Sequence, residues 1–123
     1  MEFRRVLFRS PVWGDGTELR DLLYTDDFVE AIQMIIEKQE TYDVYNVGSN
    51  QVYSVNEVLG TMKQLVDNTN PIEYVSGKPS MIPVRKIDST KIERNLGWRA
   101  TTTLQEGLKK AYDWYLDNKE EFQ

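Results

Sequence analysis

The stretch YDVYNVGSNQVYSVNEVLGTMKQLV, residues 42–66, joins a strand pattern to a helix pattern. Its first part, Tyr42–Val47, is rich in β-branched and aromatic residues and ends at Gly48, which predicts a buried strand. Ser54 and Glu57 then have the spacing of a capping box, and apolar residues follow at helical spacing. A strand followed by an amphipathic helix predicts the α/β class.

The segment before this stretch predicts a hairpin and another helix. Val12-Trp13 leads into Gly14-Asp15-Gly16, where the Asp-Gly pair favours a tight turn, and Leu22–Tyr24 is the expected returning strand. Asp27 and Glu30 have capping-box spacing, and the apolar residues that follow lie on one face of a helix. We therefore expect a helix that begins near Asp27 and buries one face.

The segment after the opening stretch predicts a strand and two helices. Ile72–Val75 is a short strand candidate, and the turn-rich residues that follow contain Gly and Pro. A short helix is expected from Ser89 to Leu96, with Gly97 as its stop signal. Thr103 and Glu106 have the spacing of another capping box, at the start of the last helix.

Composition limits the functions that this chain can have. Its 123 residues correspond to one small domain, and its net charge of −5 argues against binding nucleic acid or anionic membranes through bulk charge. The absence of Cys and His excludes thiol catalysis and a Ser-His-Asp triad within the chain, and we expect no metal site. No apolar run is long enough to span a membrane, so we expect a cytoplasmic protein.

The domain is expected to occupy residues 11–118. The opening MEFRRVLFRS, residues 1–10, has three arginines but neither a signal-peptide core nor a cleavage site, and we interpret it as a leader foreign to the domain. Residues 119–123 are expected to fray.

Three motifs that suggest chemistry have simpler structural explanations. Gly14-x-Gly16 lacks the third glycine of a dinucleotide fingerprint, since Leu19 stands there, so it predicts a turn. Tyr74 and Lys78 have Tyr-x-x-x-Lys spacing, but the neighbouring Gly and Pro exclude the helix that a catalytic pair needs. Asp26-Asp27 is interpreted as negative charge at a helix N-terminus.

Several other residues keep two interpretations open. Arg20 either pairs with Asp21 or binds a phosphate group through its forked guanidinium. Trp13 is either a core residue or a surface for stacking a base. Ser54 is first a helix cap, at an N-terminus that could also hold an anion. Lys78 and Arg85 lie in a Pro-rich loop, where solvated charge is the simplest interpretation.

Several sequence blocks, taken in order, resemble the C-terminal part of extended short-chain dehydrogenases, the nucleotide-sugar epimerase/dehydratase/reductase family. The blocks are VWGDGTELRDLLYTDDFVEAI (12–32), YNVGS (45–49) with YSVNEVL (53–59), GKPSMIPVRKIDSTK (77–91), LGW (96–98) and LQEGLKKAYDWYLDN (104–118). Within the family, the Trp-Gly-x-Gly block and Lys78-Pro79 look most like GDP-L-fucose synthases. Met81 departs from the acid that UDP-sugar epimerases often carry near this position.

The resemblance implies roles for five residues. Trp13 would border the base or sugar of a nucleotide sugar, and Arg20 and Lys78 would clamp its diphosphate. Ser54 would lie at the rim of the same pocket, and Arg85 would add a phosphate or ribose contact. No residue of this chain is expected to be catalytic or to bind the cofactor, because the family's Gly-x-x-Gly-x-x-Gly loop and helical Tyr-x-x-x-Lys belong to an N-terminal Rossmann core that this sequence lacks.

The expected function is therefore nucleotide-sugar binding within an NAD- or NADP-dependent epimerase/reductase of GDP-L-fucose-synthase type, with no catalysis by this chain alone. The cofactor would bind the missing N-terminal part, and the intact parent would be a homodimer. One alternative is a fragment of a UDP- or dTDP-sugar 4-epimerase or dehydratase. Another is a free-standing, non-catalytic nucleotide-binding module. We expect the isolated chain to be unstable or prone to aggregation.

Overall fold

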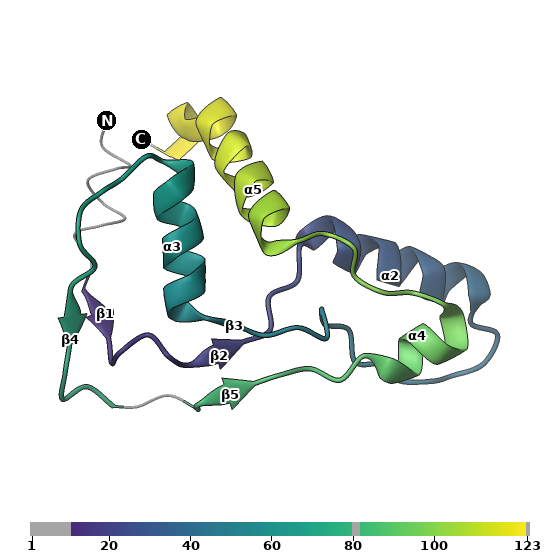
Figure 1. Ribbon diagram of the computed structural model, residues 1–123. Coiled ribbons are helices and arrows are strands. Elements are labelled where there is room, and N and C mark those ends of the chain that lie inside the picture. The colour runs from purple at the N-terminus through teal and green to yellow at the C-terminus, as the bar shows by residue number, and fades with distance from the viewer. Residues whose placement is uncertain (1–10, 80–81, 123) are drawn as a thin grey trace.

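The computed structural model describes residues 11–79 and 82–122. The opening ten residues, interpreted above as a leader, lie outside the described residues, as do Ser80 and Met81. The elements follow one another as β1 (Val12–Trp13), β2 (Leu19–Arg20), α2 (Thr25–Lys38), β3 (Tyr53–Ser54), α3 (Val55–Leu65), β4 (Tyr74–Val75), β5 (Val84–Arg85), α4 (Thr90–Leu96), α5 (Leu104–Asn118) and η1 (Lys119–Phe122). The predicted mixture of helices and strands is confirmed (Figure 1).

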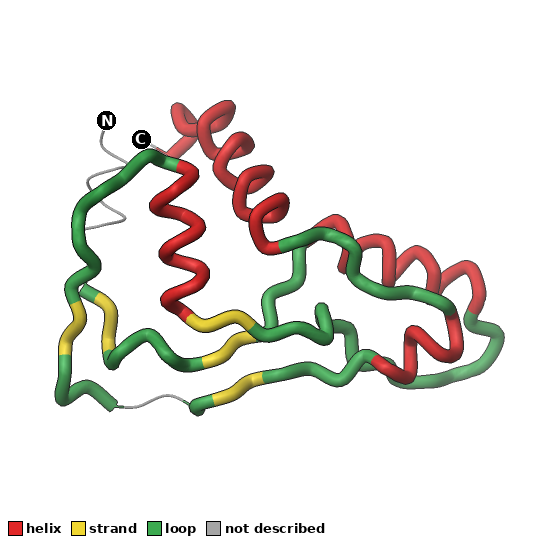
Figure 2. Tube along the Cα trace, in the orientation of Figure 1, coloured by secondary structure: helices red, strands yellow, loops and turns green. Residues whose placement is uncertain are grey.

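The strands are short and form two small sheets (Figure 2). β1 pairs with β4 in parallel, while β2 lies between antiparallel β3 and parallel β5. The predicted hairpin is therefore wrong, because β1 and β2 belong to different sheets and Leu22–Tyr24 forms no strand. The Gly14–Gly16 loop, which follows β1, is instead bound to β4, since the Gly14 N–H donates to the Val75 carbonyl at 3.0 Å.

The hydrophobic core lies where α2, α4 and the segment after α4 meet. Its buried members are Ala31, Ile92, Leu96 and Trp98. The Trp98 indole N–H donates to the main-chain carbonyl of Asp27 at 3.1 Å, so the largest buried side chain is also tied to the first turn of α2. At the other end of the molecule, α5 packs against α3. No helix among the described residues is long and apolar enough to cross a membrane.

Two of the three predicted capping boxes are confirmed. The hydroxyls of Ser54 and Thr103 each accept the main-chain N–H three residues on, and Glu57 and Glu106 reach back to the N-cap N–H. Gly97 ends α4 in the left-handed conformation with φ of 78°, which glycine adopts without steric cost. Lys119–Phe122, where the sequence predicts a frayed end, form a short 3₁₀ helix.

The third capping box, at Asp27, is wrong. α2 begins at Thr25 without a side-chain cap, so Asp27 lies inside the first turn. Its carboxylate is buried and accepts the Thr102 N–H at 3.0 Å and the Thr101 hydroxyl at 3.3 Å. Asp27 therefore anchors the segment before α5, a tertiary role that local spacing does not reveal.

The buried strand predicted at Tyr42–Val47 is also wrong for this chain. The segment has no strand partner among the described residues, and the Tyr42 side chain is 93% exposed. Lys91 on α4 holds it instead: its ammonium donates to the Val44 carbonyl at 2.9 Å and lies 5.0 Å from the centre of the Tyr45 ring. The β-rich composition is that of a strand, but a strand needs a neighbouring edge to pair with.

Candidate functional site

Trp13 and Lys78, distant in sequence, meet on the surface of the protein. The parallel β1–β4 pairing places Trp13 opposite Val75, and the chain after β4 brings the Lys78 ammonium to 5.3 Å from the centre of the Trp13 ring. The Trp13 side chain is 58% exposed, so it is not a core residue. An exposed indole beside an ammonium offers both a stacking face and a positive charge.

Arg20 and Arg85 lie beside each other on the second sheet. They are register partners on β2 and β5, so their side chains leave the same face of the sheet. Neither forms an ion pair with a carboxylate in the described part of the chain. Two guanidinium groups on one face repel each other, and an anion between them would relieve that repulsion.

Arg20 is held in position by main-chain carbonyls. Its Nη1 donates to the carbonyls of Leu19 at 2.8 Å and Ile82 at 2.7 Å, which leaves Nε and Nη2 without a partner among the described residues. The alternative pairing with Asp21 is not formed. The Asp21 carboxylate instead accepts the N–H and the hydroxyl of Ser49, both at 2.8 Å.

The Trp13–Lys78 pair and the two arginines form what we call the strip, which consists of Trp13, Lys78, Arg20 and Arg85. Lys78 is four residues from Ile82, whose carbonyl binds Arg20, so their Cα atoms are at most about 14 Å apart. In Figure 1 the β1–β4 pair lies at the left side of the molecule and the β2–β5 pair at its lower side. The strip therefore combines an exposed indole beside an ammonium on the β1–β4 pair with two arginines on the β2–β5 pair.

Ser54 lies next to this strip but its hydroxyl is occupied. It is the register partner of Leu19, and its hydroxyl donates to a Glu57 carboxylate oxygen at 2.9 Å and accepts the Glu57 N–H at 3.1 Å. The Ser54 N–H also donates to Glu57, and these bonds lower the pKa of that carboxyl below its usual range. Glu57 thus supplies at the start of α3 the negative charge that an external anion would bring.

An acid of the glycine loop is also held in its charged form. The hydroxyl and the N–H of Thr17 donate to the Asp15 carboxylate at 2.6 Å and 3.0 Å, which lowers the pKa of Asp15. No group of three or more His, Asp or Glu side chains suited to a metal ion occurs within residues 11–79 and 82–122.

No motif in the sequence points to Asn56, and Tyr74 stands out only by its spacing to Lys78, but both residues support the strip. The Tyr74 hydroxyl donates to Asn56 Oδ1 at 2.5 Å, and Asn56 Nδ2 donates to the Asp15 carbonyl at 3.0 Å. Tyr74 lies on β4 and Lys78 beyond a turn, so the prediction that Tyr-x-x-x-Lys is not helical here is confirmed. A single amide side chain that binds a loop produces no periodic pattern in the sequence, so the sequence does not reveal it.

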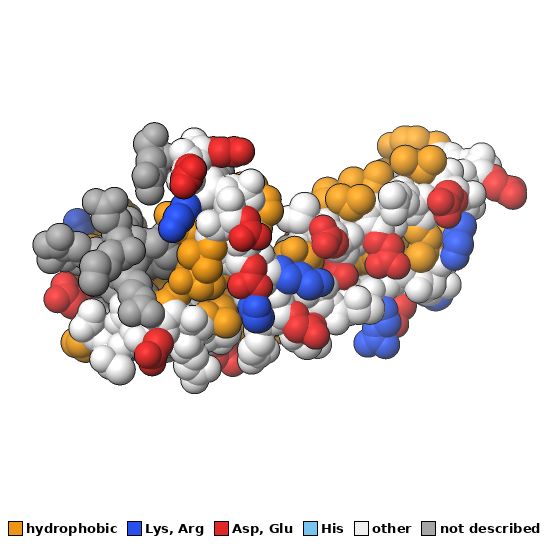
Figure 3. Space-filling model, turned by 90° about the horizontal axis from the view of Figure 1, so that it is seen from above, with side chains coloured by type: hydrophobic (Ala, Val, Ile, Leu, Met, Phe, Trp, Pro, Cys, Tyr) orange, Lys and Arg blue, Asp and Glu red, His pale blue; other side chains and the backbone are white. Residues whose placement is uncertain are grey.

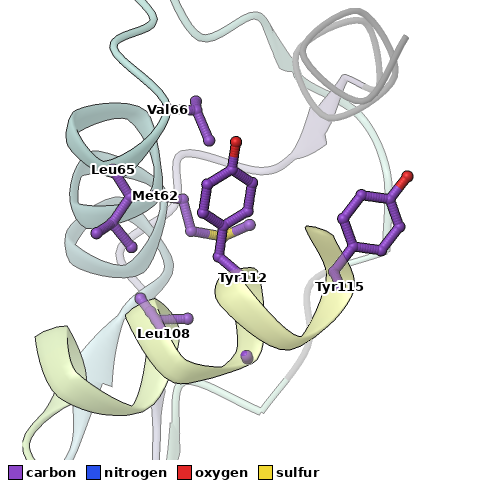
Figure 4. Close-up of a pocket in the computed structure, with 7 residues that line it drawn as sticks. Met62, Leu65, Val66, Leu108, Tyr112 and Tyr115 are labelled. Atoms are coloured by element: carbon purple, nitrogen blue, oxygen red, sulfur yellow. The ribbon is translucent and has the colours of Figure 1, made fainter. Parts of the chain in front are cut away.

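Apolar hollows lie elsewhere and contain none of the predicted site residues. One of about 160 Å³ lies between α3 and α5 (Figure 4). Its lining is Met62, Leu65, Val66, Leu108, Ala111, Tyr112 and Tyr115. Another of about 200 Å³ lies between residues 22–24 and the start of α5. Their lining offers no positive charge to a phosphate group.

Comparison with known proteins gives consistent matches over most of the chain. The family described as GDP-mannose 4,6 dehydratase matches residues 7–111. A trifunctional UDP-glucose 4,6-dehydratase/UDP-4-keto-6-deoxy-D-glucose 3,5-epimerase/UDP-4-keto-L-rhamnose-reductase of Arabidopsis thaliana is 37% identical over 112 residues, which are 89% of this chain and 17% of the relative. GDP-L-fucose synthase 1 of the same plant is 33% identical over 107 residues, 87% of this chain and 33% of the relative.

A solved structure agrees with these relatives. The dTDP-glucose 4,6-dehydratase of Bacillus anthracis, in complex with NAD, is 31% identical with a TM-score of 0.78, covering 89% of this chain and 35% of that one. The chain thus spans about a third or less of the length of these proteins. Its α/β architecture is a part of the extended short-chain dehydrogenase architecture, as the sequence resemblance predicts.

Proposed function

The chain belongs to the GDP-mannose 4,6-dehydratase family of extended short-chain dehydrogenases, and on that basis we propose that it forms the nucleotide-binding part of a nucleotide-sugar site. The observation that carries the proposal is the pairing of Arg20 with Arg85 on one sheet face, with no carboxylate partner among the described residues. A diphosphate provides the matching charge and the oxygen geometry that guanidinium groups bind in a forked manner.

The arginines would bind the diphosphate from a partly fixed arrangement. Arg20 already has one nitrogen bound to the Ile82 carbonyl, so less side-chain freedom is lost when its other nitrogens bind a phosphate. Arg85 is exposed and would close on the ligand from the neighbouring strand. Each charge-assisted hydrogen bond of this kind contributes about 1.5–3 kcal/mol to binding.

Trp13 and Lys78 would bind the nucleoside end and the adjoining phosphate. The exposed indole can stack on a base or sugar, and the ammonium at its side can approach a phosphate oxygen. Ser54 would form the rim through its place on β3 rather than through its hydroxyl, which caps α3. The relatives' names contain UDP, GDP and dTDP sugars, and the resemblance of residues 12–20 and 77–79 favours a GDP sugar.

In this proposal, the glycine loop at residues 14–16 does not bind a nicotinamide cofactor. The Gly14–Gly16 loop is closed, because the Asn56 side chain fills the space beside Gly16 and the Gly14 N–H binds the Val75 carbonyl. A cofactor such as the NAD in the structure of the Bacillus relative would therefore be held by other parts of an intact enzyme. In this proposal, the chain supplies substrate binding and no hydride-transfer group.

Calorimetric titration of the chain with UDP, GDP and dTDP tests the proposal. We expect binding of at least one of the three, weakened about 10-fold or more by Arg85→Ala and by Lys78→Ala. Arg20→Lys should also weaken it, because lysine lacks the fork and the bond to Ile82. Arg99→Ala is the matched control, since its side chain is 73% exposed and outside the strip.

Two results would contradict the proposal. One is the absence of heat with all three nucleotides in chain shown to be folded by circular dichroism. The other is an equal loss of affinity in Arg99→Ala and Arg85→Ala, which would indicate nonspecific attraction between the nucleotide and positive charge.

A further inference from the structure

We propose that Asn56 is a positioning residue that holds Trp13 and Lys78 together, an inference that rests on the proposed nucleotide site. Asn56 lies in the first turn of α3, and its hydrogen bonds within the described residues go to Asp15, Gly16 and Tyr74 rather than to a predicted ligand-binding side chain. Its amide binds the loop that follows Trp13 and the strand that precedes Lys78. It is therefore placed to set the distance between the two.

The β1–β4 ladder needs such support because it is very short. Each strand has only two residues, and two main-chain bonds flank them: Val12 N–H to the Glu73 carbonyl at 2.8 Å and Gly14 N–H to the Val75 carbonyl at 3.0 Å. An isolated pair of strands this short is not stable in water. The contact between Lys78 and Trp13 therefore depends on ties from outside the ladder.

Asn56 provides three of these ties. Its main-chain N–H donates to the Gly16 carbonyl at 3.0 Å, and its Nδ2 donates to the Asp15 carbonyl at 3.0 Å. Its Oδ1 accepts the Tyr74 hydroxyl at 2.5 Å. The side chain must donate to the loop and accept from β4 at once, which an amide does and a carboxylate does not.

The loop is shaped to receive this amide. A Cβ on Gly16 would lie 2.1 Å from Asn56 Oδ1, and the φ of Gly16 is 75°. Glycine is therefore required there both for the close approach and for the left-handed backbone. The fit between Gly16 and Asn56 indicates that the loop conformation and the Asn56 amide form one unit.

The test uses tryptophan fluorine NMR on chain labelled with 5-fluorotryptophan. Trp13 reports on the site and buried Trp98 reports on the core. When Asn56 is intact, Lys78→Met should shift the Trp13 line, because the substitution removes the ammonium beside the ring. In Asn56→Ala and Asn56→Asp we expect the Trp13 line to move and to lose its response to Lys78→Met, while the Trp98 line stays in place.

Nucleotide affinity provides a second measurement. Asn56→Ala and Asn56→Asp should weaken binding of the best of UDP, GDP and dTDP by about 3- to 10-fold, the effect of one or two hydrogen bonds. Tyr74→Phe, which removes a single hydroxyl, should give a smaller loss and keeps the test valid if the Asn56 variants do not fold. Asn95→Ala, at an exposed helical asparagine, is the matched control and should change neither measurement.

The outcomes separate the two proposals. The positioning role is overturned if, in both Asn56 variants, the Trp13 line keeps its position and its response to Lys78→Met. It is also overturned if the Trp98 line moves as much as the Trp13 line. If the unmodified chain binds no nucleotide but the Trp13 response is lost as expected, the proposed function fails while the positioning role stands. If the chain binds nucleotide equally well with and without the Asn56 amide, only the positioning role fails.

Discussion

Asp27→Ala should destabilise the chain far more than its place in a helix N-terminal turn would indicate. The carboxylate is only 4% exposed and accepts the Thr102 N–H at 3.0 Å and the Thr101 hydroxyl at 3.3 Å. Losing hydrogen bonds to a buried charged acceptor costs about 1.5–3 kcal/mol, and losing negative charge in the first turn of a helix costs about 0.3–1 kcal/mol. We expect the free energy of unfolding to fall by about 2–4 kcal/mol, a large share of the usual 5–15 kcal/mol.

Urea unfolding followed by tryptophan fluorescence measures this loss, because unfolding exposes the buried Trp98. With a slope of about 1.5–2 kcal/mol per molar urea for a domain of this size, the midpoint should fall by about 1–2.7 M. Asp27→Asn keeps an oxygen that can accept the Thr102 N–H, so it should lose less. The bond from the Trp98 indole uses the main-chain carbonyl of Asp27 and is retained in both variants.

Asp26→Ala is the matched control, because Asp26 is exposed and shares the first turn of α2. It removes the same favourable charge at the helix N-terminus without any tertiary bond, so it should cost only about 0.3–1 kcal/mol. Equal midpoints for Asp26→Ala and Asp27→Ala would refute the reasoning, since the bonds to the segment before α5 would then contribute nothing measurable.

Three further outcomes are expected. Gly60→Ala should raise the free energy of unfolding by about 0.5–1 kcal/mol in urea, because an added Cβ at this helical position meets nothing within 4 Å. The free energy of unfolding should fall as the pH drops below about 4.3, because capping bonds lower the pKa values of Glu57 and Glu106 in the folded chain. Below that pH the unfolded chain binds more protons than the folded chain. Urea midpoints measured against pH should depend less on pH when Glu57 and Glu106 are both changed to Gln. Ile36→Lys should reduce binding of a hydrophobic dye without lowering the urea midpoint, because the Ile36 side chain is 75% exposed on α2, which also exposes Phe28, Val29 and Ile32. Hydrophobic side chains gather on the surface over this helix (Figure 3).

Local signals predicted the helices well. The capping boxes at Ser54 and Thr103 and the glycine stop at Gly97 are confirmed because each depends on atoms within a few residues. Asp27 shows where this reasoning ends. Its spacing to Glu30 is that of a capping box, but its carboxylate binds residues more than 70 positions away, and only the folded chain brings those residues to it.

The strands were predicted poorly because local composition does not identify the strand with which each one pairs. Tyr42–Val47 has the residues of a buried strand but no neighbouring strand within the described residues, whereas the two-residue strand at Leu19–Arg20 has little strand character and pairs on both sides. The Asp-Gly turn favours a hairpin, but the loop instead binds α3 and β4, which lie far along the chain.

For the candidate site too, the sequence indicated the types of residue but not where the fold places them. Charge and aromatic character identified Trp13, Arg20, Lys78 and Arg85 as candidates, yet parallel pairings across about sixty residues are what bring them together. The Tyr74–Lys78 spacing is not helical here, because Tyr74 lies on a strand and Lys78 beyond it. On this backbone, however, the tyrosine hydroxyl binds the amide of Asn56 while the lysine reaches Trp13. Both contacts arise from a geometry that a helical motif could not indicate.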